Sequence, residues 1–220
     1  MAEGEVPRSG TGPGDVPAQP DLDEAVRRTA GVQPGRRAFH ATGGLLIAWL
    51  LVSDGFGRSV VVPLLAAALA IALALDWLRL RSPAANVRFF RALRLLASPR
   101  ERDRVASSTW YLVGVLATIL LAPTSYAVSA ILVLALADPA ASVVGRLWGR
   151  HPLGSGTVLG TVTFATVATL VLAARHPLPL AIGVALLVSV AEALDIRVDD
   201  NLRVPLATGL ALMVLGTGLG

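Results

Sequence analysis

Several long apolar runs, separated by short polar segments, fill this chain from about residue 41 to its end. Hydrophobic residues make up 54% of the 220 residues and charged residues only 15%, and the mean hydropathy is +0.66. A single soluble domain of this composition would expose much apolar surface to water. The chain is therefore predicted to be an all-α, polytopic integral membrane protein.

Seven membrane spans are predicted, near residues 41–52, 60–78, 109–121, 126–144, 157–173, 178–194 and 204–219. Several are shorter than the roughly 20 residues that a perpendicular helix needs, so the first and third are expected to extend into their polar flanks. Residues 1–34 are rich in Gly, Pro, Asp and Glu and have no apolar block long enough for a signal peptide. We predict a disordered cytoplasmic tail for residues 1–34 and a membrane domain for residues 35–220.

The arginines indicate an orientation. All 19 basic residues are Arg, and with seven spans all but Arg58 and Arg175 fall on one side of the membrane. Because positively charged loops stay in the cytoplasm, the N-terminus is predicted inside and the C-terminus outside. Cysteine is absent, which excludes disulfides and thiolate metal sites.

The basic loop after the second span is predicted to contain helices. Ser82 followed by Pro83 is typical of a helix start. Arg88, Arg91 and Arg94 then recur among apolar residues, which favours an amphipathic helix at the membrane interface, although an ordinary basic loop explains the same residues. Ser98 and Glu101 have capping-box spacing, so Glu101 has a structural explanation that competes with a catalytic one.

Asp138 is the most unusual acidic residue, because it lies within an apolar run. A carboxylate at membrane depth costs on the order of 2.5 to 3.5 kcal/mol, so such residues usually have a function or a partner. The alternative is that Asp138 caps a broken helix that restarts at Pro139. Ala141, Gly145 and Gly149 follow at four-residue spacing, a pattern that more often means close helix packing than phosphate contact.

Other polar residues lie beside the predicted spans. Asp199, Asp200 and Asn201 offer the oxygen ligands that Mg²⁺ prefers, although such runs are usually turn residues. Asp76 and Arg79 are three residues apart and can pair with each other on a helix. His40 follows Arg36 and Arg37 and could act as a base or a phosphate donor, or only as a polar anchor.

These short motifs resemble the CTP-dependent polyprenol and lipid-alcohol kinase family, which includes dolichol kinase, phytol kinase and the yeast-type diacylglycerol kinase. Arg36-Arg37-Ala38-Phe39-His40 is similar to the family's Arg-Lys-x-x-His. Asp138-Pro139-Ala140-Ala141 with Gly145-Arg146 and Gly149 resembles its Asp-Pro-Ala-Ala-x-x-Gly-Arg-x-x-Gly signature, and Asp200-Asn201-Leu202 with Pro205 resembles its Asp-Asn-Leu-x-x-Pro element. The resemblance covers about residues 36–220.

The chain departs from the family after the second motif. Where the family has Lys-Ser/Thr-x-Glu-Gly-Ser, this sequence has Gly156 at the Lys position and Leu159 at the Glu position. No lysine occurs anywhere in the chain. One phosphate-binding charge must therefore come from an arginine, such as Arg146 or Arg150, or be missing.

The resemblance implies phosphoryl transfer from a nucleoside triphosphate, in that family CTP, to the hydroxyl of a membrane lipid alcohol. It implies Mg²⁺ bound by Asp138, Asp200 and Asn201, with Asp138, His40 and Asp200 as the catalytic residues. The residues expected to contact nucleotide or substrate are Arg36, Arg37, Asp76, Arg79, Gly145, Arg146, Thr157 and Asn201. A Walker-type loop is absent from the sequence, which excludes a P-loop kinase.

Two alternatives stay open at this point. A lipid-phosphate cytidylyltransferase-like enzyme would use similar carboxylates and metal but form a CDP-linked product. A non-catalytic membrane homologue or small transporter would explain the hydrophobicity and the missing Lys and Glu, although no internal repeat is visible. The chain's expected environment is the bilayer, and no nucleic acid is expected as a partner.

Overall fold

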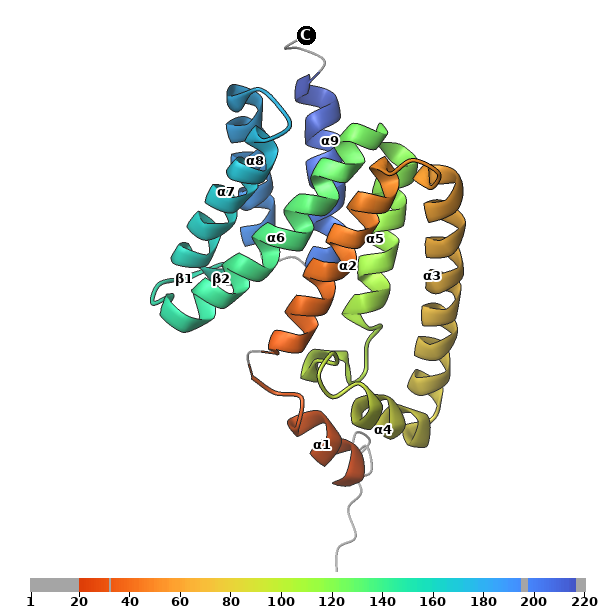
Figure 1. The fold of residues 1–220 in the computed structure, drawn as a ribbon. Helices are drawn as coiled ribbons and strands as arrows, with labels where there is room; N and C mark the ends of the chain where they lie inside the picture. The colour runs from red at the N-terminus through yellow and green to blue at the C-terminus, as the bar shows by residue number, and fades with distance from the viewer. Residues whose placement is uncertain (1–19, 32, 195–197, 217–220) are drawn as a thin grey trace, which may run out of the picture.

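The computed structural model describes residues 20–31, 33–194 and 198–216, and it is a bundle of helices (Figure 1). The bundle helices are α2 (Pro34–Val52), α3 (Gly57–Arg81), α5 (Ser107–Leu121), α6 (Thr124–Trp148), α7 (Val158–Ala173), α8 (Leu178–Ala193) and α9 (Asp200–Gly216). Each of the seven predicted apolar spans overlaps one of these helices, and residues 217–219 of the last span lie outside the described part of the chain. The predicted all-α class is confirmed apart from one very small hairpin.

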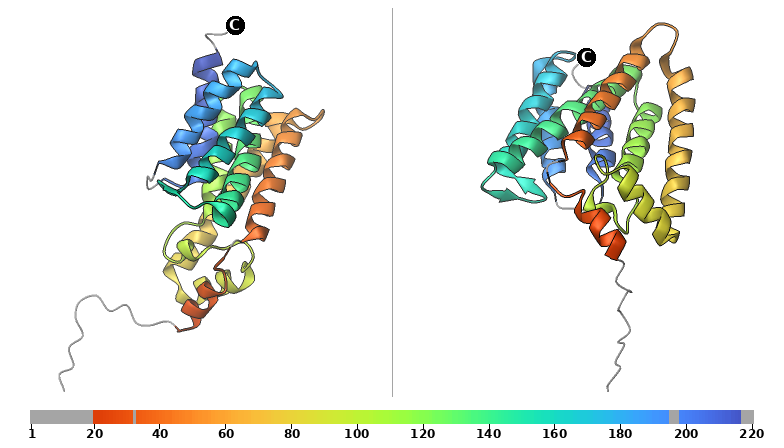
Figure 2. Two further views of the ribbon diagram at one scale, coloured as in Figure 1. Left: turned by 90° about the vertical axis from the view of Figure 1, so that its left-hand side faces the viewer. Right: turned by 60° about the horizontal axis from the view of Figure 1, so that its bottom comes forward.

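Helix α6 lies at the centre and packs against α2, α7 and α9 (Figures 1 and 2). The core that these helices share is apolar and enclosed. Its residues include Ile131, Phe164, Val184 and Leu212, each 0% exposed. Helix α5 packs on α9, and α3 packs on α5 at the edge of the bundle. Because α6 contacts so many neighbours, a polar residue on α6 can be reached by side chains from several helices.

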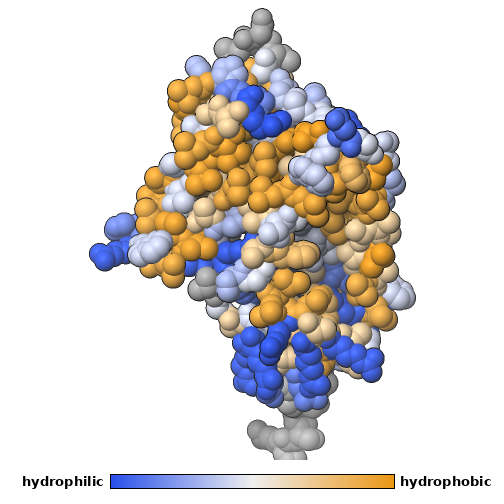
Figure 3. All heavy atoms as spheres, viewed as in Figure 1, coloured by the Kyte–Doolittle hydropathy of each residue, from blue (hydrophilic) through white to orange (hydrophobic). Residues whose placement is uncertain are grey.

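The outer surface of the bundle is apolar. Large hydrophobic side chains such as Ile71, Leu170 and Leu187 are more than half exposed. Figure 3 shows a broad hydrophobic belt on the face in view and hydrophilic residues gathered at its lower end, over α1 and α4. Contact between such a belt and water costs free energy, whereas contact with lipid chains does not.

By length and composition, α3 and α6 are the two described helices that are long and apolar enough to cross a membrane. Helices α5, α7 and α8 are apolar but have only 10–17 residues each. The long helices and the apolar belt agree with a location in the membrane. The count of seven membrane crossings stays a prediction.

A helix lies within the segment that we predicted to be a disordered tail. Helix α1 (Pro20–Arg27) packs through Leu22, Ala25 and Val26 against Phe90 and Ala97. Asp23 pairs with Arg102 at 2.6 Å. The prediction was therefore wrong for residues 20–27, because these few apolar residues find a protein surface to cover. Residues 1–19 lie outside the described part of the chain.

Helix α4 (Pro83–Ala92) begins where Ser82 and Pro83 predicted, and the Ser82 hydroxyl accepts a hydrogen bond from the Ala85 amide at 3.3 Å. The arginines Arg88, Arg91 and Arg94 are exposed, as an interfacial helix requires. The apolar side of α4, however, packs against α1 through the fully buried Phe90. In this structure, the protein itself therefore covers much of the face that we expected to meet lipid.

Two local features differ from the expectations. Helix α6 runs without interruption through Pro139, so the alternative interpretation of Asp138 as the cap of a broken helix is wrong. A two-stranded antiparallel hairpin, β1 (Pro152–Leu153) and β2 (Gly156–Thr157), precedes α7 and was not predicted. Gly154 at its turn has φ of 52°, a backbone conformation that glycine adopts without steric cost.

Candidate active site

An open cavity of about 890 Å³ lies at one end of the bundle. Its walls come from the start of α2, the segment around the short 3₁₀ helix η1 (Pro99–Glu101), the C-terminal half of α6 and the start of α9. Figure 3 shows hydrophilic side chains in the hollow below α6. The predicted site residues that line the cavity are Arg36, Arg37, His40, Asp138, Arg146, Asp200 and Asn201. Residues from three separate sequence motifs therefore meet in one place.

Arg37 has a guanidinium that is only partly satisfied. Its Nη2 donates to the Ser142 hydroxyl at 2.7 Å, while its Nε and Nη1 are buried and have no hydrogen-bond acceptor. Burial and the nearby Arg146 lower the pKa of Arg37, and Asp138 acts in the opposite direction. A buried donor without an acceptor is costly. An anion such as a phosphate oxygen would satisfy Arg37.

Acidic side chains lie close together at the cavity, where Asp138, Asp199 and Asp200 line the wall and Glu192 lies behind it. Asp138 lies within electrostatic reach of Asp200, Glu192 and Asp199. The pKa of the Asp200 carboxyl is raised overall. Burial is the main cause and the nearby Asp199 adds to it, while the ion pair with Arg203 acts in the opposite direction. One carboxylate oxygen of Glu192 is buried without a hydrogen-bond donor. This set of hard, crowded oxygens fits a divalent cation.

The number of protein ligands limits which cation site is possible. Among the described residues, no group of three or more His, Cys, Asp or Glu side chains is arranged to hold a metal ion. Mg²⁺ commonly uses one or two carboxylates and completes its shell with water and phosphate oxygens. Asp138 and Asp200 therefore fit Mg²⁺ bound together with a nucleotide, and the Mg²⁺ site stays a prediction.

Asn201 lines the cavity, but its side-chain nitrogen is used within the protein. It donates to Asp199 Oδ1 at 2.9 Å and to the Ser107 carbonyl at 3.3 Å. Asp199 Oδ1 also accepts the Asn201 backbone amide, and its Oδ2 accepts the Ser107 hydroxyl. We predicted Asn201 as a metal ligand. These bonds use the amide nitrogen to join the starts of α5 and α9 and not the side-chain oxygen that would bind Mg²⁺, so the metal-ligand role stays a prediction.

His40 lies deep in the cavity wall, with only 7% of its surface exposed. Its ring packs on Tyr111 with the ring centres 4.8 Å apart. A simple anchor at the membrane surface would be more exposed. The surroundings of His40 instead fix the orientation of its ring, as a base or a hydrogen-bond donor requires.

Arg36 and Arg146 complete the basic part of the cavity. Arg36 Nη1 lies 3.4 Å from a carboxylate oxygen of the buried Glu101. The same carboxylate accepts hydrogen bonds from the amides of Ser98 and Ser107, each at 3.2 Å. The predicted capping role of Glu101 is therefore confirmed. Arg146 is exposed and donates to the Gly31 carbonyl at 3.2 Å, which leaves most of its guanidinium accessible.

Gly145 and Thr157 do not line the cavity. The Thr157 hydroxyl caps α7 by accepting the Gly160 amide at 3.1 Å. A Cβ atom added at Gly145 would lie 2.9 Å from that hydroxyl, and one added at Gly149 would lie 2.3 Å from it. The small residues therefore allow close packing of α6 on α7, which is the alternative that we left open for them. The assignment of Gly145 and Thr157 as substrate contacts finds no support in their positions.

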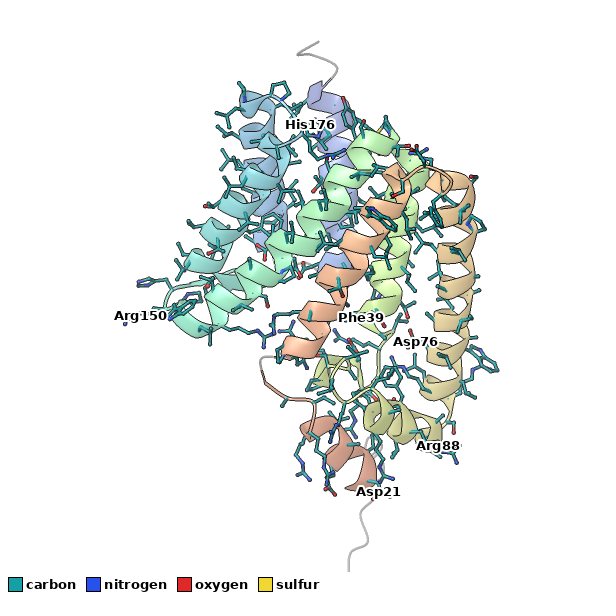
Figure 4. The ribbon with its side chains drawn as sticks, in the orientation of Figure 1. Asp21, Phe39, Asp76, Arg88, Arg150 and His176 are labelled. Carbon is teal, nitrogen blue, oxygen red and sulfur yellow. The ribbon has the colours of Figure 1, made fainter. Side chains whose placement is uncertain are left out.

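Asp76 and Arg79 also lie away from the cavity. Figure 4 shows Asp76 near the lower end of α3, on the side facing α5. The two side chains are 4% and 2% exposed and form an ion pair at 2.6 Å. We predicted them as nucleotide contacts. In the structure, both are instead enclosed in a hydrogen-bond network and pair with each other, which does not support that prediction.

Several cavity residues escaped the sequence analysis. Ser142 orients Arg37, Ser107 bonds to Asn201 through its carbonyl, and Arg100 and Arg104 face the cavity from the η1 segment. Ser142 lies one turn after Asp138, which was the available signal. Gly156 and Leu159, where the family has Lys and Glu, do not line the cavity.

The comparisons with known proteins agree with these motifs. The chain is 32% identical over 115 residues to CTP-dependent diacylglycerol kinase 1 of Eremothecium gossypii, covering 52% of this chain and 36% of that protein. It is 28% identical over 116 residues to CTP-dependent diacylglycerol kinase 1 of Schizosaccharomyces pombe, covering 53% of each. The matched region is thus about half or less of these relatives' own lengths.

No family model matches the chain, and no solved structure matches it. The support therefore comes from the two sequence relatives and from the motifs that meet at the cavity. The two relatives confirm the resemblance of the motifs: over about half of its length, this chain is related to CTP-dependent lipid kinases.

Proposed function

We propose that this protein transfers the terminal phosphate of CTP to the hydroxyl of a membrane lipid. The observation that carries the proposal is the meeting of Arg37, Asp138 and Asp200 at one open cavity, with two guanidinium nitrogens of Arg37 buried and without acceptors. Because both relatives are named CTP-dependent diacylglycerol kinases, diacylglycerol is the first substrate to test. Polyprenols, dolichol and phytol are further candidates.

The cavity residues would divide the work as phosphoryl transfer requires. The lipid hydroxyl oxygen attacks the γ-phosphorus of CTP, the bond to the β–γ bridging oxygen breaks, and CDP leaves. Such a reaction depends on positioning and on neutralising negative charge. Arg37 and Arg146 would bind phosphate oxygens, Asp138 and Asp200 would hold the metal, and the hydroxyl proton would pass to a base, for which His40 is our candidate. Mg²⁺, when bound, neutralises charge on the β- and γ-phosphates.

The same proposal includes an orientation in the membrane. The cavity, α1 and α4 lie at one end of the bundle, while the loop before α8 lies at the other end, as Arg88, Arg150 and His176 show in Figure 4. The arginine distribution supports a cytoplasmic position for the cavity end. CTP would then reach the site from the cytoplasm, and the lipid would reach it from the bilayer.

The experiment uses the purified full chain in lipid nanodiscs with Mg²⁺ and CTP or ATP labelled in the γ-phosphate. Diacylglycerol, a polyprenol, dolichol and phytol are supplied in turn, and the lipid products are separated. We expect a labelled phosphomonoester with CTP. Asp138→Asn should lose most of this activity, while Asp54→Asn, which changes an exposed acid far from the cavity, should not.

Two results would redirect the assignment. A CDP-linked product would indicate a lipid-phosphate cytidylyltransferase, the alternative that uses the same carboxylates. Absence of any phosphomonoester with every alcohol and both nucleotides, while the protein is folded, would indicate a non-catalytic homologue.

A further inference from the structure

The buried pair of Asp76 and Arg79 is the centre of an extensive hydrogen-bond network. One carboxylate oxygen of Asp76 accepts Arg79 Nε at 2.6 Å. The other accepts the Ala106 amide at 3.1 Å and the Thr109 hydroxyl at 2.6 Å, so that Asp76 holds the start of α5. Burying a charge is costly unless it is paired and hydrogen-bonded, and here both charges are. The pair therefore has a fixed geometry.

The remaining donors of this network hold the segment between α4 and α5. Arg79 donates to the carbonyl of Glu101 at 2.8 Å and to the carbonyl of Arg104. Asn86 of α4 accepts from Arg79 and donates to the carbonyl of Arg102 at 2.8 Å. The Arg79 guanidinium also lies 4.4 Å from the centre of the Phe89 ring. Three carbonyls in the four residues from 101 to 104 are thus held from the side of α3 and α4.

The same segment forms one wall of the cavity. Arg100, Arg102 and Arg104 all line it. Arg102 pairs with Asp23 of α1, but Arg100 and Arg104 are exposed and form no ion pair with any other described residue. Arg100 also lies within electrostatic reach of Asp200 across the cavity. Two unpaired cations therefore face a cavity that already holds Arg37 with its unsatisfied nitrogens.

We propose that Asp76 and Arg79 are positioning residues, which hold the segment 98–106 so that Arg100 and Arg104 bind the phosphates of the nucleotide. This inference rests on the proposed function for the identity of the ligand. It also explains how the chain forms a cationic phosphate site without a lysine, since Arg100 and Arg104 add two positive charges to those of Arg37 and Arg146. Asp76 and Arg79 act on the reaction only through this wall.

The first test needs no catalytic turnover. Hydrogen–deuterium exchange is measured in nanodiscs for the wild type and for Asp76→Asn, with Thr109→Val as a milder variant that removes one hydrogen bond at nearly constant shape. We expect exchange in residues 98–106 to become roughly 5- to 10-fold faster, the equivalent of one lost hydrogen bond, with α7 and α8 unchanged. The matched control is Thr118→Val in the same helix, because its buried hydroxyl bonds only to the Gly114 carbonyl of its own helix.

The second test measures the KM for CTP and for the lipid separately. Asp76→Asn, Thr109→Val and Arg100→Gln should each raise the KM for CTP several-fold and leave the KM for the lipid unchanged. Arg81→Gln is the charge-matched control, since Arg81 ends the same helix as Arg79 but lies outside the cavity. A general loss of stability would lower the apparent kcat through the amount of folded protein and would leave both KM values unchanged.

Unchanged exchange in residues 98–106 in both Asp76→Asn and Thr109→Val would overturn the positioning role. Faster exchange spread equally over α7 and α8 would also overturn it, because Asp76 would then only stabilise the fold. A normal KM for CTP in Arg100→Gln would overturn the phosphate role of the wall. If the wild type turns over no lipid at all, the proposed function fails, while the exchange experiment still decides whether the pair holds the segment.

Discussion

Asp138 is the residue on which the proposed chemistry depends most. It lines the cavity, and its carboxylate makes no hydrogen bond with the described residues. Asp138→Asn removes a charge at nearly constant shape, so we expect turnover to fall by roughly 10²-fold or more, a few kcal/mol of transition-state stabilisation. Mg²⁺-dependent turnover and the melting curve are measured together, and the melting temperature should stay close to that of the wild type.

Asp200→Asn should show the same pattern if Asp200 shares the metal, with one difference. Asp200 also pairs with Arg203, so this variant frees the guanidinium as well. The assignment of both acids is wrong if these two variants keep near-normal turnover at saturating Mg²⁺.

Glu101 also lines the cavity, but its buried carboxylate is occupied by the Ser98 and Ser107 amides and by Arg36. In Glu101→Gln, the new NH₂ group would face donors instead of acceptors. We expect a loss of about 1–3 kcal/mol in the free energy of unfolding, while turnover per folded molecule changes much less than in Asp138→Asn. Thermal unfolding and turnover of the same preparation check this. A stable Glu101→Gln protein without turnover would instead make Glu101 a catalytic candidate.

At the scale of the elements, the contact between α5 and α9 decides where Asp200 lies. Gly114 faces the first turn of α9, and a Cβ atom there would lie 2.2 Å from the Asn201 carbonyl oxygen. Because that oxygen belongs to the backbone, Gly114→Ala must push the helices apart. We expect a loss of stability of about 1–3 kcal/mol and a fall in turnover through displacement of Asp200.

The control for this substitution is Gly183→Ala in α8, where an added Cβ atom would have no neighbour within 4 Å. Alanine favours helix more than glycine does, so Gly183→Ala should be neutral or slightly stabilising. Equal effects of the two substitutions on the melting temperature would show that Gly114 does not fill a close helix contact.

The sequence predicted the helices better than their details. The apolar runs locate the bundle helices because burial in a core and burial in lipid need the same residues. The continuity of α6 at Pro139 could not be predicted, since neighbouring helices hold both halves in line. Helix α1 was missed because its three apolar residues form a core only with residues much later in the chain, Phe90 and Ala97.

The candidate site was predicted to a similar extent. Arg37, Asp138 and Asp200 could be assigned from their motifs, and the structure brings them to one cavity. The role of Asp76 could not be derived, because a nucleotide contact and a buried ion pair need the same two residue types at the same spacing. Only the position of the η1 segment, which packs against the pair, separates the two explanations.

For the whole molecule, the two ends of the bundle differ, because the candidate site lies at one end only. The start of α2, the end of α3, α4, η1 and the start of α9 gather at one end, and the C-terminal end of α9 lies at the other (Figures 1 and 2). In the proposed reaction, soluble CTP would reach the first end, while the apolar belt between the ends suits the bilayer. A lipid kinase needs this arrangement, because its two substrates come from different phases.

The last prediction is the orientation of this bundle in the cell. The chain contains no cysteine, so single substitutions can be labelled without background. We expect Arg88→Cys and Arg150→Cys to react with a membrane-impermeant maleimide only after the cells are opened, because the arginine-rich end should face the cytoplasm. Asp54→Cys and Arg175→Cys lie at exposed positions of the opposite end and should react in intact cells. Labelling of Arg88→Cys from outside intact cells would contradict the orientation, and would place the cavity on the side of the membrane that has no CTP.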